Sequence, residues 1–373
     1  MRLRASVSIG YKDIFSDFDK VDINILLLDI PTQNSLELIA HSLAQLHANE
    51  RDKSLQIELL KIWVGRLPKY IHDSLNSFID LHANFVFLNN ISGLIFIEKL
   101  IEQENQLARL KEFTPDQELN VFKVYLYCSQ LWLDKQLPVF LNGKIENNID
   151  LIKAVLPSQL PFLELLEYKD FRLQFLKAVY FFKFCETNKQ FLEYLNIFLK
   201  EYNLESWQIY LSNILSLYAR KFEKNTTPSV INIPNEYIIS FLGDLSIDTK
   251  QFKQSDDFLS IRNKPVYRFS KNDFIFLNLN FLVDKIYQGI QFDFSKVLVN
   301  NLAKYNGKVI KSTADFMTIF GDEFSENGLF YSVMDYAFEK SGFVKFNGQT
   351  MKGFLGGGEP DYYIRDKSKI YIF

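Results

Sequence analysis

Cysteine is scarce in this chain, and the residue spacings that mark common enzyme sites are missing. The two cysteines, Cys128 and Cys185, lie in apolar, helix-like surroundings, which predicts buried, reduced thiols and no disulfide framework. No two of the four histidines are three or four residues apart, so they predict no zinc site. There is no nucleophile elbow and no dinucleotide fingerprint, and the glycines at 356–358 are not followed by the Lys-Ser or Lys-Thr of a phosphate-binding loop.

Long hydrophobic stretches are also missing. No segment reaches the ~18 apolar residues that a transmembrane helix requires. The basic residues near the N-terminus are not followed by the apolar core of a signal peptide. Together with the unpaired cysteines, this predicts a cytoplasmic protein that does not contact a membrane.

Excess charge of either sign is absent as well. The net charge is −3, and from residue 300 onward nine Lys and Arg balance nine Asp and Glu. Nucleic-acid binding would therefore depend on a local basic patch. What the chain does have is phenylalanine, with 36 residues, which predicts well-filled cores and argues against disorder.

The first 245 residues have the periodicity of helices joined by short loops, and we expect an all-helical domain there. The clearest helix start is Thr114-Pro115-Asp116-Gln117, where Thr114 can cap, Pro115 suits the first turn and Gln117 can bond back to the cap. That helix is predicted to end before Pro138. Most of the apolar residues on these helical faces are expected to serve core packing.

The pattern changes after Ser246. Residues 264–269 and 274–277 predict two strands joined by a polar turn, and a helix is expected after them. We therefore expect a small α+β connector over 246–311. A third domain, 312–373, is expected to begin with a helix that continues to residue 340, followed by a strand at 343–346 and a turn at Asn347-Gly348.

The last residues predict a β-hairpin. Residues 362–364 and 370–373 are aromatic and β-branched, and 365–368 has the composition of a turn. Asp361 follows Pro360 at the start of the first strand, and the helix before this region carries Glu323 and Glu326. Since these glutamates are three residues apart, both can share one face of an α-helix.

A Pro-Asp at the start of a hairpin strand, preceded by a helix that carries Glu, resembles the PD-(D/E)xK nuclease superfamily. The resemblance covers roughly the last seventy residues and implies an incomplete α/β core of the restriction-endonuclease type. It implies that Asp361 and Glu326 are catalytic, and that Asp361, Glu326 and Glu323 hold Mg²⁺ or Mn²⁺. The superfamily's acidic-x-Lys triplet would begin where the given sequence stops, at Phe373.

The resemblance thus implies the N-terminal portion of a metal-dependent nuclease, inactive without its triplet. Its partner would be nucleic acid, DNA rather than RNA, with a protein partner for the helical region. The alternative is a non-catalytic helical interaction or scaffold protein. In that case Asp361 is a turn residue, and Glu323 and Glu326 favour the helix dipole near a helix start.

Overall fold

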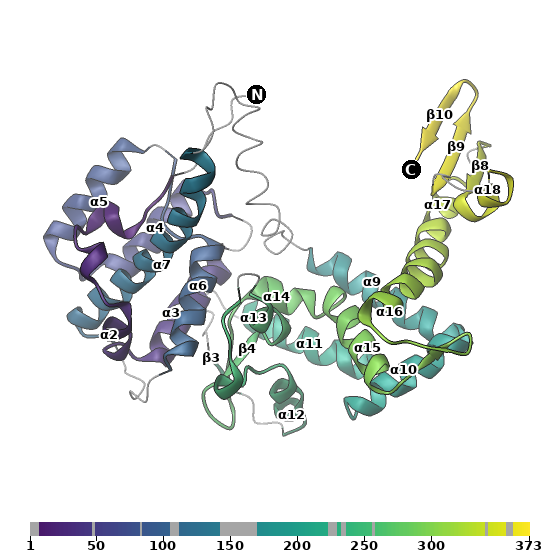
Figure 1. The fold of residues 1–373 in the computed structure, drawn as a ribbon, viewed down its shortest axis with the longest axis horizontal. Helices are drawn as coiled ribbons and strands as arrows, with labels where there is room; N and C mark the ends of the chain where they lie inside the picture. Colours follow the sequence, from purple (N-terminus) through teal and green to yellow (C-terminus); the bar gives the residue numbers. More distant parts are fainter. Residues whose placement is uncertain are drawn as a thin grey trace. The chain divides into compact units, whose positions relative to one another are not determined.

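The computed structural model describes residues 7–46, 49–82, 84–104, 112–141, 170–222, 230–232, 236–255, 258–339, 342–355 and 361–373 (Figure 1). The backbone forms two compact units, each made of two stretches of chain: Met1–Asp170 with Asn213–Val283, and Phe171–Ser212 with Asp284–Phe373. The prediction of a mainly helical chain is confirmed, but the expectation that residues 1–245 are all-helical is wrong, because the short strands Val7–Ser8, Phe85–Val86 and Val230–Asn232 lie there. The division into three consecutive domains, 1–245, 246–311 and 312–373, stays a prediction.

The first unit is a group of helices with two small sheets. Its helical elements are α1 (Tyr11–Ile14), η1 (Phe18–Lys20), α2 (Ile23–Leu28), α3 (Thr32–Leu46), α4 (Lys53–Val64), α5 (Lys69–Leu81), α6 (Asn90–Glu102), α7 (Pro115–Leu141), α12 (Glu236–Asp244), η2 (Thr249–Gln251), α13 (Leu259–Asn263) and most of α14 (Leu279–Asp284). Its strands are β1 (Val7–Ser8), β2 (Phe85–Val86), β3 (Val230–Asn232), β4 (Val266–Arg268) and β5 (Asp273–Phe276). None of the described helices is both long and apolar enough to cross a bilayer.

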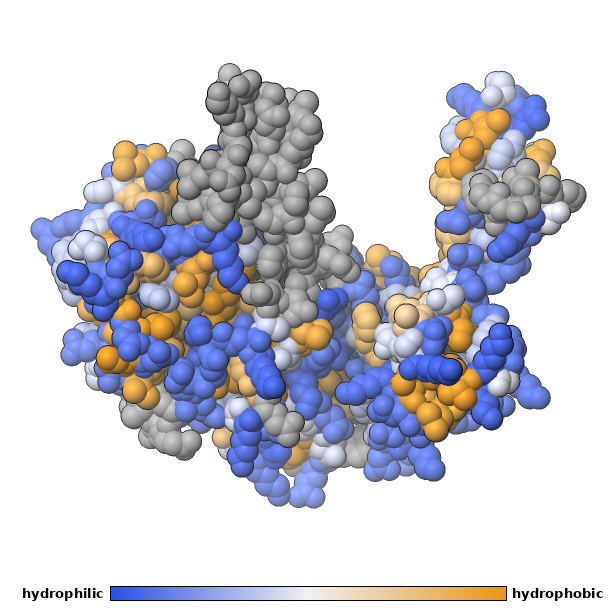
Figure 2. Space-filling view, in the orientation of Figure 1, coloured by the Kyte–Doolittle hydropathy of each residue, from blue (hydrophilic) through white to orange (hydrophobic). Residues whose placement is uncertain are grey.

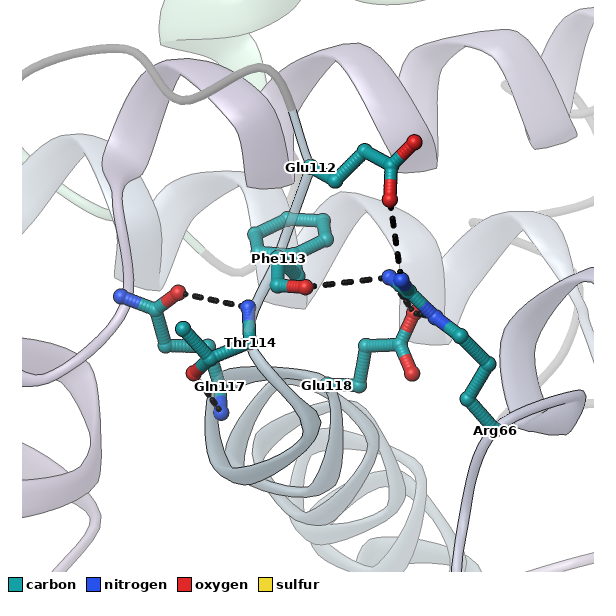
Figure 3. A network of polar contacts seen from close by, with 6 residues as sticks. All are labelled: Arg66, Glu112, Phe113, Thr114, Gln117 and Glu118. Carbon is teal, nitrogen blue, oxygen red and sulfur yellow. Dashed lines mark hydrogen bonds and ion pairs between the residues drawn. The ribbon is translucent and has the colours of Figure 1, made fainter.

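The start of α7 shows how local sequence sets a helix boundary. The Thr114 amide donates to the Gln117 side chain at 3.0 Å, and the Gln117 amide donates to the Thr114 hydroxyl at 3.3 Å. This capping box is the one that the sequence predicts. Beside it, the Arg66 guanidinium donates to Glu112, to Glu118 and to the carbonyl of Phe113 (Figure 3). The helix continues to Leu141, so the expected end before Pro138 is wrong.

The interior of the first unit is organised by one buried glutamine. The Gln56 side chain accepts hydrogen bonds from the amides of Phe87 and Leu88 at 3.0 and 2.9 Å, and it donates to the Leu88 carbonyl at 2.8 Å. The Tyr125 hydroxyl donates to the Phe87 carbonyl at 2.9 Å. These bonds satisfy the backbone amides and carbonyls of Phe87 and Leu88, which lie between β2 and α6 and are not paired with a neighbouring strand.

The predicted hairpin of the connector is present. β4 pairs antiparallel with β5, as predicted, and β3 pairs with the other edge of β5, giving the strand order β3-β5-β4. Tyr267 and Ile275 of this sheet belong to the same apolar core as the N-terminal helices. The sheet of the connector therefore packs as part of the first unit, whereas residues 284–311 of the expected connector belong to the second unit.

The second unit combines helices with a C-terminal sheet. Its helices are α9 (Phe171–Thr187), α10 (Lys189–Glu201), the first part of α11 (Trp207–Phe222), α15 (Gln288–Asn300), α16 (Thr313–Phe320), the π-helix η3 (Gly321–Phe330), α17 (Tyr331–Ala337) and α18 (Gly348–Leu355). Its strands are β6 (Lys304–Tyr305), β7 (Lys308–Val309), β8 (Val344–Asn347), β9 (Tyr362–Asp366) and β10 (Lys369–Ile372).

Phenylalanine fills the interior of the second unit, as the composition predicts. The Phe181 ring lies 5.3 Å from the rings of Phe294, Phe320 and Phe324, and Phe198 stacks on Phe294 at 4.9 Å. These contacts join α9 and α10 to α15, α16 and η3. They hold in place the continuous helical segment of α16, η3 and α17, called the rod below, which carries Glu323 and Glu326.

That rod changes its winding between α16 and α17. Over Gly321–Phe330 the helix is a π-helix, whose turns are wider than the 3.6 residues of an α-helix. The Tyr331 amide accordingly bonds to the carbonyl of Glu326, five residues earlier. A β-carbon on Gly328 would lie 3.2 Å from the Phe184 ring, so the glycine lets this ring pack against the rod. Figure 1 shows α17 continuing from the rod to the sheet of β8, β9 and β10.

Candidate functional site

The hairpin at the end of the chain is the one that the sequence predicts. β9 and β10 pair antiparallel, and β8 pairs with the other edge of β9, giving the order β10-β9-β8. Asp361 stands one residue before β9, and its carbonyl accepts a hydrogen bond from the Gly348 amide at 2.8 Å. The expected turn at Asn347-Gly348 is instead the start of α18, where the Asn347 side chain accepts from the Thr350 amide at 2.9 Å.

A small core fixes this sheet to α17. Tyr331, Tyr362 and Ile364 are buried together, with Phe330 and Met334 packed against them. The Tyr362 hydroxyl donates to the Asp335 carboxylate, and the Lys345 ammonium donates to the Asp335 carbonyl at 2.9 Å. The position of Asp361, next to Tyr362, is therefore set by packing against the helix.

The structure brings two of the three predicted carboxylates to one tyrosine. The Tyr331 hydroxyl donates to the half-buried Glu326 carboxylate at 3.5 Å. Burial, the charges of Glu326 and Asp361, and this hydrogen bond raise the pKa of Tyr331, whereas a hydrogen bond donated by the Gly348 backbone amide lowers it. Glu326 from the π-helix thus bonds to the Tyr331 hydroxyl, and the charge of exposed Asp361 from the hairpin acts on the pKa of the same tyrosine.

Glu323 lies in a different setting. Its carboxylate accepts a hydrogen bond from the Tyr305 hydroxyl, on β6. This hydrogen bond, burial and the Glu323 charge raise the pKa of Tyr305 to about 12. The assumption that Glu323 and Glu326 share one face was made for an α-helix, and the wider π-helix does not keep that relation. The third predicted ligand is therefore held by a separate tyrosine.

The carboxylates of the candidate site can be compared with the ligands that Mg²⁺ usually has in proteins. Among the described residues, no group of three or more His, Cys, Asp or Glu is arranged to hold a metal ion. Mg²⁺ is commonly bound by only one or two carboxylates together with water and substrate phosphates. Glu326 and Asp361, which both act on the Tyr331 hydroxyl, fit that smaller requirement. Mg²⁺ or Mn²⁺ stays a prediction.

Two residues of the site were not identified from the sequence. Tyr331 and Asp335 are aromatic and acidic residues on a helix, which is a common pattern with no chemical specificity. The signal for Tyr331 is its distance from Glu326, five residues, which becomes meaningful only for a π-helix. No propensity in the segment predicts that winding.

The cysteines play no part in this site. Both Cys128 and Cys185 are buried, as predicted. Burial raises the pKa of the Cys128 thiol to about 12 and that of Cys185 well above its ordinary value, which keeps both thiols protonated and unreactive.

No family model, no curated protein and no solved structure matches this chain.

Proposed function

We propose that the segment from α16 to β10 is the front half of a metal-dependent nuclease core that acts on nucleic acid, DNA in particular. The observation that carries the proposal is that Glu326, on a helix, hydrogen-bonds the Tyr331 hydroxyl, and that the charge of Asp361, at the start of a strand, raises the pKa of the same tyrosine. The elements run as a helical stretch from α16 to α17, then β8, α18, β9 and β10, and a helix followed by three paired strands agrees with the proposal.

The register of the hairpin adds support. Phe373 and Tyr362 exchange backbone hydrogen bonds, with 3.0 Å from the Phe373 amide to the Tyr362 carbonyl. One further step along this ladder would lie opposite Asp361. An acidic-x-Lys triplet continuing from β10 would therefore stand next to Asp361.

In this proposal Glu326 and Asp361 hold the cation. When bound, Mg²⁺ or Mn²⁺ polarises the scissile phosphate and lowers the pKa of a bound water. The Tyr331 hydroxyl fixes the Glu326 carboxylate, and the Gly348 amide fixes the backbone of Asp361. Glu323, bound by Tyr305, supports the rod that carries Glu326.

Cation binding tests the proposal directly. Mn²⁺ affinity is measured by electron paramagnetic resonance on the full chain, and Tb³⁺ luminescence excited through tyrosine reports whether the ion lies near a tyrosine. We expect D361N and E326Q each to weaken binding by at least about tenfold, a loss typical of a removed ligand. D366N, at the other end of the same strand, is the matched control and should bind like the wild type. Equal binding by all four proteins would refute the site.

The second candidate function is a protein-interaction module, and one feature of α9 favours it. Leu176 and Tyr180 lie four residues apart on this helix, with exposed fractions of 61% and 44%. Exposed apolar residues at this spacing suit docking against a partner helix or groove. If this candidate is correct and the nuclease proposal is not, the Leu176→Glu variant should no longer bind a protein partner that the wild-type chain binds. D361N should then change neither the binding of that partner nor the binding of Mn²⁺.

A further inference from the structure

The three-stranded sheet has one face buried against α17 and one that faces away from it. Tyr362 and Ile364 point to the buried core, so Tyr363 and Arg365 lie on the opposite, outer face. The register places Phe346 and Ile372 on either side of Tyr363, and Val344 and Ile370 on either side of Arg365. These six residues form the outer face, and this name is used for them below.

The outer face is exposed to an extent that is unusual for apolar strand residues. The exposed fractions are 51% for Val344, 43% for Phe346, 56% for Ile370 and 66% for Ile372. Figure 2 shows hydrophobic residues interleaved with hydrophilic ones on this hairpin, at the upper right. A contiguous exposed patch of this kind marks an interaction site.

The centre of the outer face is an aromatic pair on adjacent strands. The rings of Phe346 and Tyr363 lie 6.2 Å apart, with an angle of 37° between their planes. Next to them is a cavity of about 520 Å³ whose lining includes both rings together with Arg365 and Lys367. Such a cavity is large enough for a small ligand such as a nucleobase with its sugar.

The net positive charge at the tip of the β9–β10 hairpin favours the binding of an anion. The hairpin tip from Arg365 to Lys369 carries three cationic side chains and one anionic one, within a C-terminal region whose charges balance overall. Arg365 is exposed, and its Nε atom donates to the Lys367 carbonyl at 3.0 Å, which holds the guanidinium at the hairpin tip. The same positive charge disfavours a second copy of this face as the occupant, because like charges would meet.

We propose that the outer face binds single-stranded nucleic acid, with bases stacked on Phe346 and Tyr363 and phosphates paired with Arg365 and Lys367. Stacking on sheet aromatics beside cations is how single strands are bound without a base-specific code. The proposal rests on the proposed function for the choice of nucleic acid as ligand, but it uses none of the carboxylates of the candidate site.

Fluorescence anisotropy of a labelled oligodeoxythymidylate with the full chain tests it. We expect F346A and Y363A each to weaken binding by roughly tenfold or more, the effect of losing one stacked base. Y363F keeps the ring and should bind like the wild type. Y336A removes a tyrosine of α17 that is 83% exposed and serves as the control.

The charges are tested by salt dependence. Each phosphate contact with a single strand contributes about 0.7 to the slope of log affinity against log salt, so R365Q with K367Q should make the slope shallower by about 1.4. Circular dichroism checks that each variant folds; the substituted positions lie on the exposed side of the sheet, where side-chain changes leave the core intact.

The outcomes separate this inference from the proposed function. Binding that D361N and E326Q leave unchanged, and that F346A reduces, supports the outer face whatever the result for Mn²⁺. No oligonucleotide binding by a chain that binds Mn²⁺ at Glu326 and Asp361 overturns this inference alone. Self-association in sedimentation runs that F346A abolishes would also overturn it, since a second copy would then be the occupant.

Discussion

The amide of Gly348 donates a hydrogen bond to the carbonyl of Asp361 at 2.8 Å. This bond continues the β8–β9 ladder by one residue beyond the pair Asn347 and Tyr362. The backbone of Asp361 is therefore held by the sheet, while its carboxylate stays exposed. Substitutions of this side chain should consequently change the electrostatics of the site without changing the fold.

The first prediction concerns the acidity of Tyr331. Burial and the negative charges of Glu326 and Asp361 disfavour its phenolate. In D361N and in E326Q one of these charges is removed, so the pKa of Tyr331 should fall in both. The measurement is a ¹³C NMR titration of tyrosine-labelled protein, with Y331F used to assign the signal.

E323Q is the control for this titration, because Glu323 bonds to Tyr305 and not to Tyr331. The Tyr331 signal should titrate in E323Q as in the wild type. A Tyr331 pKa that is insensitive to D361N would show that Asp361 does not act on this hydroxyl, and the two-carboxylate site would lose its basis.

A second prediction follows from the Tyr305–Glu323 pair. The folded protein holds the pKa of Tyr305 at about 12, chiefly through the hydrogen bond to Glu323, whereas a free tyrosine titrates near 10. A raised pKa means that the folded state keeps a proton which the unfolded state loses. The contribution of this pair to stability is thus fully present below pH 10 and is lost as the pH rises toward 12.

In E323Q the charged acceptor is gone, so the Tyr305 pKa should move back toward 10. The same NMR titration measures this, with Y305F for assignment. Unchanged titration of Tyr305 in E323Q would mean that burial alone raises its pKa.

Comparison of sequence and structure shows which signals were local. The capping box at Thr114 and Gln117 and the terminal hairpin were predicted correctly, because each depends on residues close together in the chain. The boundary between α9 and α10 holds two adjacent residues that can cap a helix: the cap of α10 is Asn188, whose side chain accepts from the amides of Gln190 and Phe191, while Thr187 ends α9. Adjacent capping residues compete, and packing of the preceding helix decides between them.

The site was predictable in part for the same reason. Asp361 could be placed at the start of a strand from Pro360 and the residues after it. Glu326 was preferred to Glu323 as its partner on the resemblance, but the π-helical winding of η3, which places the two glutamates in different settings, could not be predicted from the sequence. The strand order β3-β5-β4 could not be predicted from the sequence either, because β3 lies more than thirty residues before β4 in the chain.

A third prediction tests the interior of the first unit. Gln56→Leu keeps the approximate shape of the side chain but leaves the buried amides of Phe87 and Leu88 without their acceptor. Each unsatisfied amide costs about 1–3 kcal/mol, so the loss of both acceptor bonds should lower the free energy of unfolding by roughly 2–6 kcal/mol. Urea denaturation followed by circular dichroism measures this. Gln45→Leu, at an exposed position on α3, is the matched control and should change stability by less than about 0.5 kcal/mol.

The last prediction compares two helical glycines. A β-carbon added to Gly93 in α6 would lie 2.7 Å from Cδ2 and 3.2 Å from Cγ of Leu43, a buried residue of α3. Because the whole Leu43 side chain would have to move, Gly93→Ala should destabilise the first unit by about 1–3 kcal/mol.

Gly321 is the counterpart, since nothing lies within 4 Å of its added β-carbon and its φ of −56° is helical. Gly321→Ala should stabilise the rod of the second unit by about 0.5–1 kcal/mol, because alanine loses less backbone entropy in a helix. Urea denaturation of both variants under the same conditions measures the two changes in the free energy of unfolding. If Gly93→Ala were as well tolerated as Gly321→Ala, the close approach of α3 and α6 at Leu43 would not be the constraint that requires glycine at position 93.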